Sequence, residues 1–132
     1  MKYFEIQELV PPQVYAERGD KALQLLDRRL LDNLDTLRLQ LDVPLTVNNW
    51  HWGGDRKYSG LRVYGSEHWG MYSQHSFGRA ADVICEVPAE EIRQKIRSRE
   101  IILPWAVHVE LDVDWLHMDV RNSRDLVNFF HG

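Results

Sequence analysis

The pattern of hydrophobic and polar residues along the chain predicts two main helices. Leucines recur at helical spacing from Lys21 to about Gln40 and define one apolar face. Asp20 precedes this segment and is a suitable residue to cap its first turn. Pro88 and the acidic residues after it open a second predicted helix, which continues to about Ser98.

Four runs of the chain have the character of strands. Leu45 to Trp50 and Ala80 to Glu86 are short, mostly apolar runs rich in residues that favour strands. Trp105 to Leu111 and Trp115 to Arg121 flank the tight acidic turn Asp112-Val113-Asp114. This spacing predicts that the last two runs form a hairpin.

The order of these elements predicts an α+β fold, with an antiparallel sheet covered by helices on one side. A last short helix is predicted from Asp125 to Phe130, capped by Asn122 or Ser123. No repeat or low-complexity linker interrupts the chain, so residues 1–132 are expected to form a single domain. Residues 51–74 show no period, and a loop of that length is unusual unless it is functional. Its aromatic residues are expected to pack the loop onto the sheet, or alternatively to wall a groove.

Composition and charge exclude several classes of protein. The net charge is −4 and the basic residues are scattered, which argues against a nucleic-acid-binding protein. No apolar stretch is long enough to span a bilayer, so no membrane partner is expected. The single cysteine, Cys85, rules out an internal disulfide framework. The N-terminus lacks the pattern of a signal peptide, so synthesis in a cytoplasm is expected.

Two short clusters supply candidate metal ligands. His75 and Asp82 lie seven residues apart with Gly78 between them, and His117 follows Asp114 by three residues in the second cluster. Two imidazoles and one carboxylate are the ligand set of a catalytic zinc ion that keeps its fourth position open for water. Asp114, in the turn just before His117, is expected close to the metal as the general base for that water.

Each candidate also has a simpler interpretation. His75 alone would be an ordinary loop histidine, and Asp82 alone a solvated carboxylate. Asp82 nevertheless interrupts an apolar run, as His117 does between Leu116 and Met118. A buried charge without a partner is costly, so both should be paired or bound to metal. Asp119 is expected to accept a hydrogen bond from a ligand histidine, or to be an exposed strand carboxylate.

Three motifs resemble those of a known enzyme family. Ser73 to Asp82 resembles the Ser-x-His-x-x-Gly-x-x-x-Asp motif of the D-Ala-D-Ala carboxypeptidase and L-alanyl-D-glutamate endopeptidase family. Asp114 to His117 is similar to the family's acid-x-x-His segment, and Tyr58 to Arg62 resembles its Ser-Gly-x-Arg segment. The motifs occur in the family's order. The resemblance implies the fold that this family shares with the hedgehog signalling domain.

The resemblance also implies roles for individual residues. It assigns three ligands to one zinc ion: His75, Asp82 and His117. Asp114 would be the catalytic base, and Glu110 is the reserve candidate for that role. Arg62 would bind a substrate carboxylate or steady the oxyanion, which suits a fixed cationic fork.

The function implied by the resemblance is a zinc metallopeptidase that hydrolyses peptidoglycan stem peptides or similar D-amino-acid peptides. It does not separate carboxypeptidase from endopeptidase action, and the ligand set would accept other divalent ions. A phage-encoded protein is expected, released to the cell wall at lysis or carried in the virion. A monomer is the default expectation for the oligomeric state. The alternatives are a zinc-binding module without catalysis and a virion structural protein that kept the fold.

Overall fold

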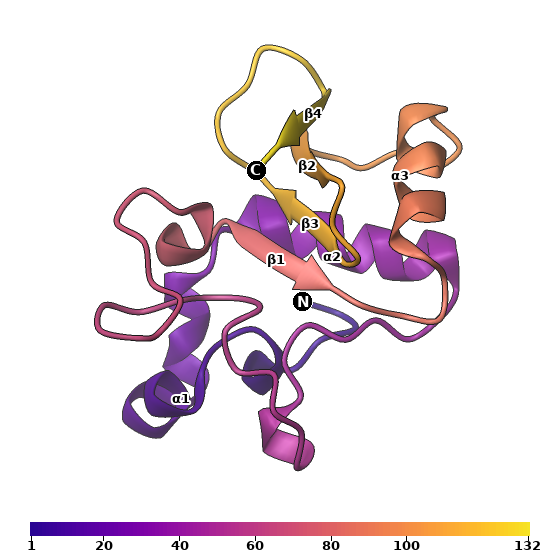
Figure 1. Ribbon diagram of the computed structural model, residues 1–132. Coiled ribbons are helices and arrows are strands. Elements are labelled where there is room, and N and C mark those ends of the chain that lie inside the picture. Colours follow the sequence, from indigo (N-terminus) through magenta and orange to yellow (C-terminus); the bar gives the residue numbers. More distant parts are fainter.

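A four-stranded sheet in the order β1-β3-β2-β4 forms the centre of the molecule, which a computed structural model describes over residues 1–132 (Figure 1). The strands are β1 (Ala80–Val83), β2 (Val107–Leu111), β3 (Leu116–Asp119) and β4 (Val127–His131). β3 pairs antiparallel with both β1 and β2, whereas β4 pairs parallel to β2. The α+β class is therefore confirmed, but the sheet is mixed and the expectation of a purely antiparallel sheet is wrong.

The predicted last helix, from Asp125 to Phe130, is wrong, because this segment contains β4. Val127 and Phe129 pack against the hydrophobic core, and Asn128 and Phe130 alternate with them along the strand. β-branched and aromatic residues favour such a pleated, half-buried surface. The exposed edge of β2 supplies the pairing partner, so a non-local contact decides the structure of this segment.

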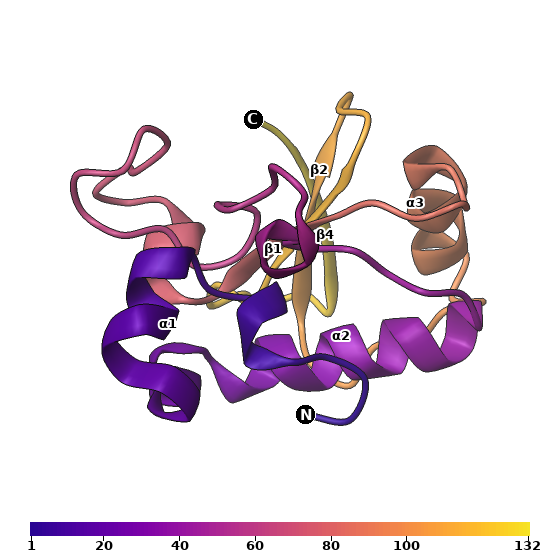
Figure 2. The same ribbon diagram turned by 90° about the horizontal axis from the view of Figure 1, so that it is seen from below.

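The chain forms three α-helices: α1 (Pro12–Arg18), α2 (Arg28–Leu41) and α3 (Ala89–Arg97). α2 lies across one face of the sheet, as the two perpendicular views show (Figures 1 and 2). Its buried face includes Leu30, Leu34 and Leu37, which join the single core cluster. α3 agrees closely with the helix predicted after Pro88. None of the helices combines the length and apolar character needed to cross a membrane.

The helix predicted from Lys21 to Gln40 is divided in two. Gly19–Leu25 forms a 3-10 helix, and α2 begins only after Asp27, whose side chain accepts a hydrogen bond of 2.8 Å from the backbone N–H of Arg29. The backbone N–H of Asp27 in turn donates to the carbonyl of Gly78 at 2.9 Å. The interruption thus brings the start of α2 against the turn that carries His75.

The strand predicted from Leu45 to Trp50 is reduced to one bridge between Thr46 and Ile84. Beyond that bridge, the backbone N–H groups of this segment bond outside the sheet: Asn48 donates to the carbonyl of Glu8, and Asn49 donates to the carbonyl of Arg56. A continuous ladder cannot form, because these donors are already used. The segment instead anchors the long loop that follows it.

The sheet has one apolar and one polar face, because strand residues alternate in direction. Ala81, Val83, Leu116 and Met118 belong to the core that α2 covers. Asp82, His117 and Asp119 share the opposite face, where no helix lies over the sheet (Figure 1). The irregular segment predicted at residues 51–74 is confirmed, apart from one 3-10 turn at Trp50–Trp52 and the start of another at Gln74, and it borders this polar face.

Candidate metal centre

His75 is held in a tight turn whose geometry leaves one ring nitrogen available. It lies in the 3-10 turn Gln74–Phe77, where the Ser73 hydroxyl accepts its backbone N–H and Gly78 ends the turn with a φ of 68°. A Cβ at Gly78 would collide with the backbone carbonyl of Leu25, so glycine is required there on two grounds. The His75 Nδ1 lies 2.9 Å from the carbonyl oxygen of Gly60. A carbonyl can only accept, so Nδ1 carries the proton and Nε2 is free to bind a metal.

Asp82 is the meeting point of the site. It lies in β1 directly opposite His117 of β3, and its Oδ1 is 2.8 Å from His117 Nδ1 and 3.3 Å from His75 Nε2. Its second oxygen, Oδ2, accepts a hydrogen bond of 3.2 Å from the guanidinium of Arg62. Burial would raise the pKa of the Asp82 carboxyl, but its interactions with His117 and His75 outweigh burial and hold the pKa well below its usual range.

His117 lies between two carboxylates. Its Nε2 is 2.9 Å from Asp119 Oδ2, on the side away from Asp82. Burial would lower the pKa of His117, but the hydrogen bonds to Asp119 and Asp82 raise it to about 9. Without a metal, His117 is therefore a cation that donates to both carboxylates. With a metal at Nδ1, the Nε2–H would still donate to Asp119, an arrangement that fixes the ring in metalloproteins.

Asp119 is fully buried and is held in place by Arg121. The guanidinium of Arg121 donates to both carboxylate oxygens, at 2.8 Å and 2.6 Å, and its backbone N–H donates as well. Burial would raise the pKa of Asp119, but these bonds and the one from His117 lower it to about 2. Of the two interpretations of Asp119 left open by the sequence, the structure favours the hydrogen-bond acceptor. Arg121 was missed, although it follows His117 and Asp119 at strand spacing on the same face.

The three predicted ligands come together in one group. One ligand atom from each of His75, Asp82 and His117 lies within 4.8 Å of the others, and all three residues are buried. Donor atoms about 2.1 Å from a tetrahedral zinc ion would be about 3.4 Å apart. The separations of 2.8 Å and 3.3 Å at Asp82 are close to that value. The donor set and the fixed histidine tautomers therefore fit a metal ion bound by three protein ligands.

The neighbours of this group differ from those expected. A cavity of about 350 Å³ contains the three ligands and is also lined by Arg62, Glu110 and Arg121. Asp114 lies elsewhere, in a smaller apolar cavity beside Cys85 and Ile92. Continuing the β2–β3 register by one residue from Val109 and Met118 places Glu110 opposite His117. Side chains alternate along a strand, so a residue three positions before His117, such as Asp114, points to the other face of the sheet. Glu110, opposite His117 on the neighbouring strand, shares its face.

Arg93 supports this arrangement from α3. Its buried guanidinium donates to the carbonyls of Val113, Trp115 and Glu110, at 3.0 Å, 3.2 Å and 3.5 Å. These bonds fix the turn between β2 and β3, and with it the relative position of Glu110 and His117. Nothing in the sequence pattern distinguished Arg93 from the other charged residues of its helix.

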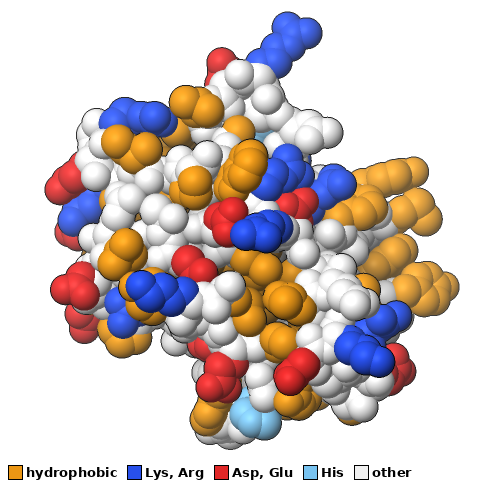
Figure 3. All heavy atoms as spheres, turned by 180° about the vertical axis from the view of Figure 1, so that it is seen from behind, with side chains coloured by type: hydrophobic (Ala, Val, Ile, Leu, Met, Phe, Trp, Pro, Cys, Tyr) orange, Lys and Arg blue, Asp and Glu red, His pale blue; other side chains and the backbone are white.

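The loop before His75 exposes much of its apolar surface. Hydrophobic side chains project from one edge of the molecule (Figure 3), and residues 61–77 form that edge in Figure 1. The exposed hydrophobic residues along this edge include Tyr64, Met71, Tyr72 and Phe77. Tyr64 and Tyr72 are 84% and 83% exposed, so they do not pack the loop onto the sheet as expected. Tyr72 instead lines the cavity that contains the three ligands.

If the site binds zinc, Asp119→Asn should weaken zinc binding by about 10- to 100-fold. The neutral amide orients the His117 ring less firmly, and it raises the basicity of the ring less than the carboxylate does. The measurement is competition with a chromophoric chelator at pH 7.5. Asp112→Asn is the matched control, since Asp112 is exposed and pairs only with His131. Equal affinity in the two variants would contradict this role for Asp119.

The chain matches no model of a known protein family, and neither the curated proteins nor the solved structures include a significant match. The support for a metal site therefore comes from its own geometry and from the three short motifs that resemble those of the peptidase family.

Proposed function

We propose that the protein is a zinc-dependent metallopeptidase that hydrolyses peptide bonds in peptidoglycan stem peptides. The observation that carries this proposal is the convergence of His75 Nε2, an Asp82 oxygen and His117 Nδ1, while the other nitrogen of each histidine is already bonded. Three ligands leave the fourth position of a tetrahedral ion open, which is typical of catalytic zinc sites. The substrate class comes from the resemblance of the three motifs to the peptidase family.

Bound zinc would supply Lewis acidity and an acidified water molecule. A base is then needed within reach of that water, and Glu110 is better placed than Asp114. Glu110 lines the cavity of the three ligands, whereas Asp114 does not. We therefore assign to Glu110 the transfer of the proton from the water to the leaving amine.

Arg62 is placed to stabilise negative charge next to the metal. Its Nε donates to the carbonyl of Tyr58 at 2.7 Å, and its Nη2 donates to Asp82 at 3.2 Å, so the guanidinium is fixed. Burial lowers the pKa of Arg62, and the nearby carboxylates of Asp82 and Glu110 oppose that change. A rigid guanidinium beside the ligands can hold an oxyanion or a substrate carboxylate without further rearrangement.

The first test is the metal content of the purified protein, measured by mass spectrometry for wild type and His75→Ala. About one zinc ion per wild-type chain, lost in the variant, is the expected result for a three-ligand site. The activity is then tested by incubating purified peptidoglycan with the zinc-loaded protein and measuring the free amino groups that hydrolysis releases.

Two outcomes would overturn the proposal. Wild-type protein that binds no zinc even after zinc is added would exclude the metallopeptidase. Zinc binding without hydrolysis of any stem peptide would favour the alternative of a non-catalytic zinc-binding module.

A further inference from the structure

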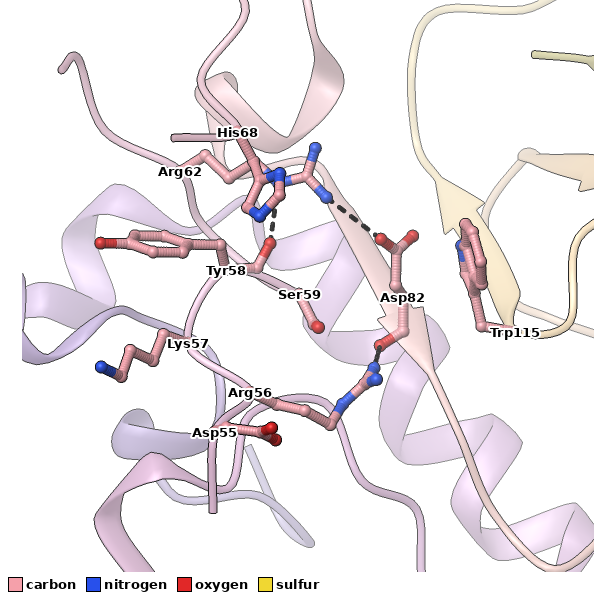
Figure 4. A pocket seen from close by; sticks show the side chains of 9 residues that line it. All are labelled: Asp55, Arg56, Lys57, Tyr58, Ser59, Arg62, His68, Asp82 and Trp115. Carbon is pink, nitrogen blue, oxygen red and sulfur yellow. Dashed lines mark hydrogen bonds and ion pairs between the residues drawn. The ribbon is translucent and has the colours of Figure 1, made fainter. Parts of the chain in front are cut away.

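A second cavity, of about 340 Å³, adjoins the metal centre on the side of the long loop (Figure 4). It shares Arg62, Asp82 and Trp115 with the cavity of the three ligands, so the two cavities adjoin each other and are together called the groove. Its remaining lining comes mainly from residues 55–59, the loop segment that ends on the serine of the Ser-Gly-x-Arg motif. A substrate whose scissile bond lies at the metal centre would extend into this cavity.

Cationic side chains outnumber carboxylates in the lining of this second cavity. It contains Arg56, Lys57 and Arg62, against the carboxylates of Asp55 and Asp82. Asp82 is already paired with Arg62 at 3.2 Å, and a bound metal ion would compensate its charge further. The half of the groove outside the metal centre therefore favours a negatively charged group.

Both arginines keep unused hydrogen-bond donors in this cavity. Arg56 donates from Nε to the carbonyl of Val47 at 2.9 Å and from Nη2 to the carbonyl of Asp82 at 3.2 Å. A guanidinium has five N–H groups, so about three remain on Arg56 after these two bonds. In Figure 4, Arg56 and Arg62 extend toward Asp82 from the same loop, and Trp115 stands on the other side of Asp82. The groups are thus fixed before any ligand binds, which lowers the entropic cost of binding.

We propose that this cavity is a carboxylate-binding subsite, in which Arg56 binds a free carboxylate of the substrate next to the bond held at the metal centre. Lys57, which is exposed at the rim, adds to the positive potential of the subsite. The inference rests on the proposed peptidase function, which it extends by naming an acidic substrate. The carboxylate has two sources in a stem peptide: the α-carboxylate of a γ-linked D-glutamate and the C-terminal carboxylate.

The test measures binding of three peptides to zinc-loaded protein carrying Glu110→Gln, so that turnover does not interfere. The probes are the pentapeptide L-Ala-γ-D-Glu-L-Lys-D-Ala-D-Ala, its form with the D-Glu α-carboxylate amidated, and its form with a C-terminal amide. One amidated form is expected to bind about tenfold more weakly than the parent, the effect of losing one charge-assisted contact. The form that loses affinity identifies which carboxylate occupies the subsite.

Arg56→Gln, added to the same protein, should remove the difference between the parent and that amidated form. If Arg56 only ties the loop to Val47 and Asp82, Arg56→Gln would weaken the binding of all three peptides by the same factor. Lys57→Gln should reduce this difference in affinity partially. Lys21→Gln is the control for the loss of a charge elsewhere, since Lys21 is exposed in the 3-10 helix Gly19–Leu25.

Three results would overturn the subsite. Equal binding of the three peptides would exclude it while leaving the peptidase function intact. If amidation lowers the affinity by the same factor in Arg56→Gln as in its parent, another residue binds the carboxylate. Failure of the zinc-loaded protein to bind any of the peptides would contradict the proposed substrate class itself, and the subsite with it.

Discussion

Glu110→Gln is expected to lower the rate of peptide hydrolysis by about 10²- to 10⁴-fold while zinc remains bound, which is the usual contribution of a positioned general base. Glutamine keeps the size of the side chain but cannot accept the proton of the attacking water. Glu110 is not among the three ligands, so its replacement should leave the metal content unchanged. The measurement is the initial rate on a stem peptide, together with the zinc content of the same preparation.

Asp114→Asn is the matched control for this prediction, since it also replaces one carboxylate by its amide within the same hairpin. Asp114 is exposed and lines a different cavity, so the rate should stay close to that of wild type. The opposite result, a large loss with Asp114→Asn and none with Glu110→Gln, would restore Asp114 as the base. It would also require the turn between β2 and β3 to rearrange when substrate binds.

The convergence of the three candidate ligands could be anticipated from the sequence because local features specify them. His75 lies in a turn that requires Gly78, and Asp82 and His117 each interrupt an apolar run inside a strand. A polar residue in such a run needs a partner, and two strands that pair can supply it. The position of a base near the metal depends instead on the register between β2 and β3. Sequence distance from His117 is therefore a poor guide, because Asp114 is nearer in sequence and Glu110 nearer in space.

The errors in the fold have the same origin. The segment from Asp125 has plausible helix-capping residues, but the free edge of β2 recruits Val127–His131 as a strand. The leucine pattern after Asp20 is helical throughout, yet a hydrogen bond from Asp27 to Gly78, about fifty residues away in sequence, accompanies the break before α2. Local propensity is a weak prior that tertiary contacts override. In both cases, the contact that decides the structure joins segments far apart in the chain.

The metal-free protein should lose stability as the pH rises from about 6.5 to about 9. The pKa of His117 is raised from 6.5 to about 9 in the folded protein, so protonated His117 stabilises the fold. That stabilisation is fully present below the pKa of the unfolded chain and disappears as the pH passes the folded pKa. The lowered pKa of Asp119 has the opposite sign, since its stabilisation is lost only as the pH falls from 3.8 toward about 2. Burial lowers the pKa of His108, so this histidine opposes the trend only up to about pH 6.5. Above that value, His117 sets the trend.

Zinc should reverse this trend and stabilise the protein more at pH 8.5 than at pH 6.0, because the metal needs the unprotonated Nδ1 of His117. Free zinc at about 1,000 times its Kd stabilises the folded state by about 4 kcal/mol, which corresponds to a rise in Tm of roughly 10–20 °C for a chain of this length. The measurement is thermal unfolding at both pH values, with chelator or with buffered zinc. His75→Ala should abolish the zinc-dependent rise but keep the pH trend of the metal-free protein, because Asp82 and Asp119 still flank His117. A zinc effect of the same size at both pH values would mean that His117 does not bind the metal through the nitrogen that faces Asp82.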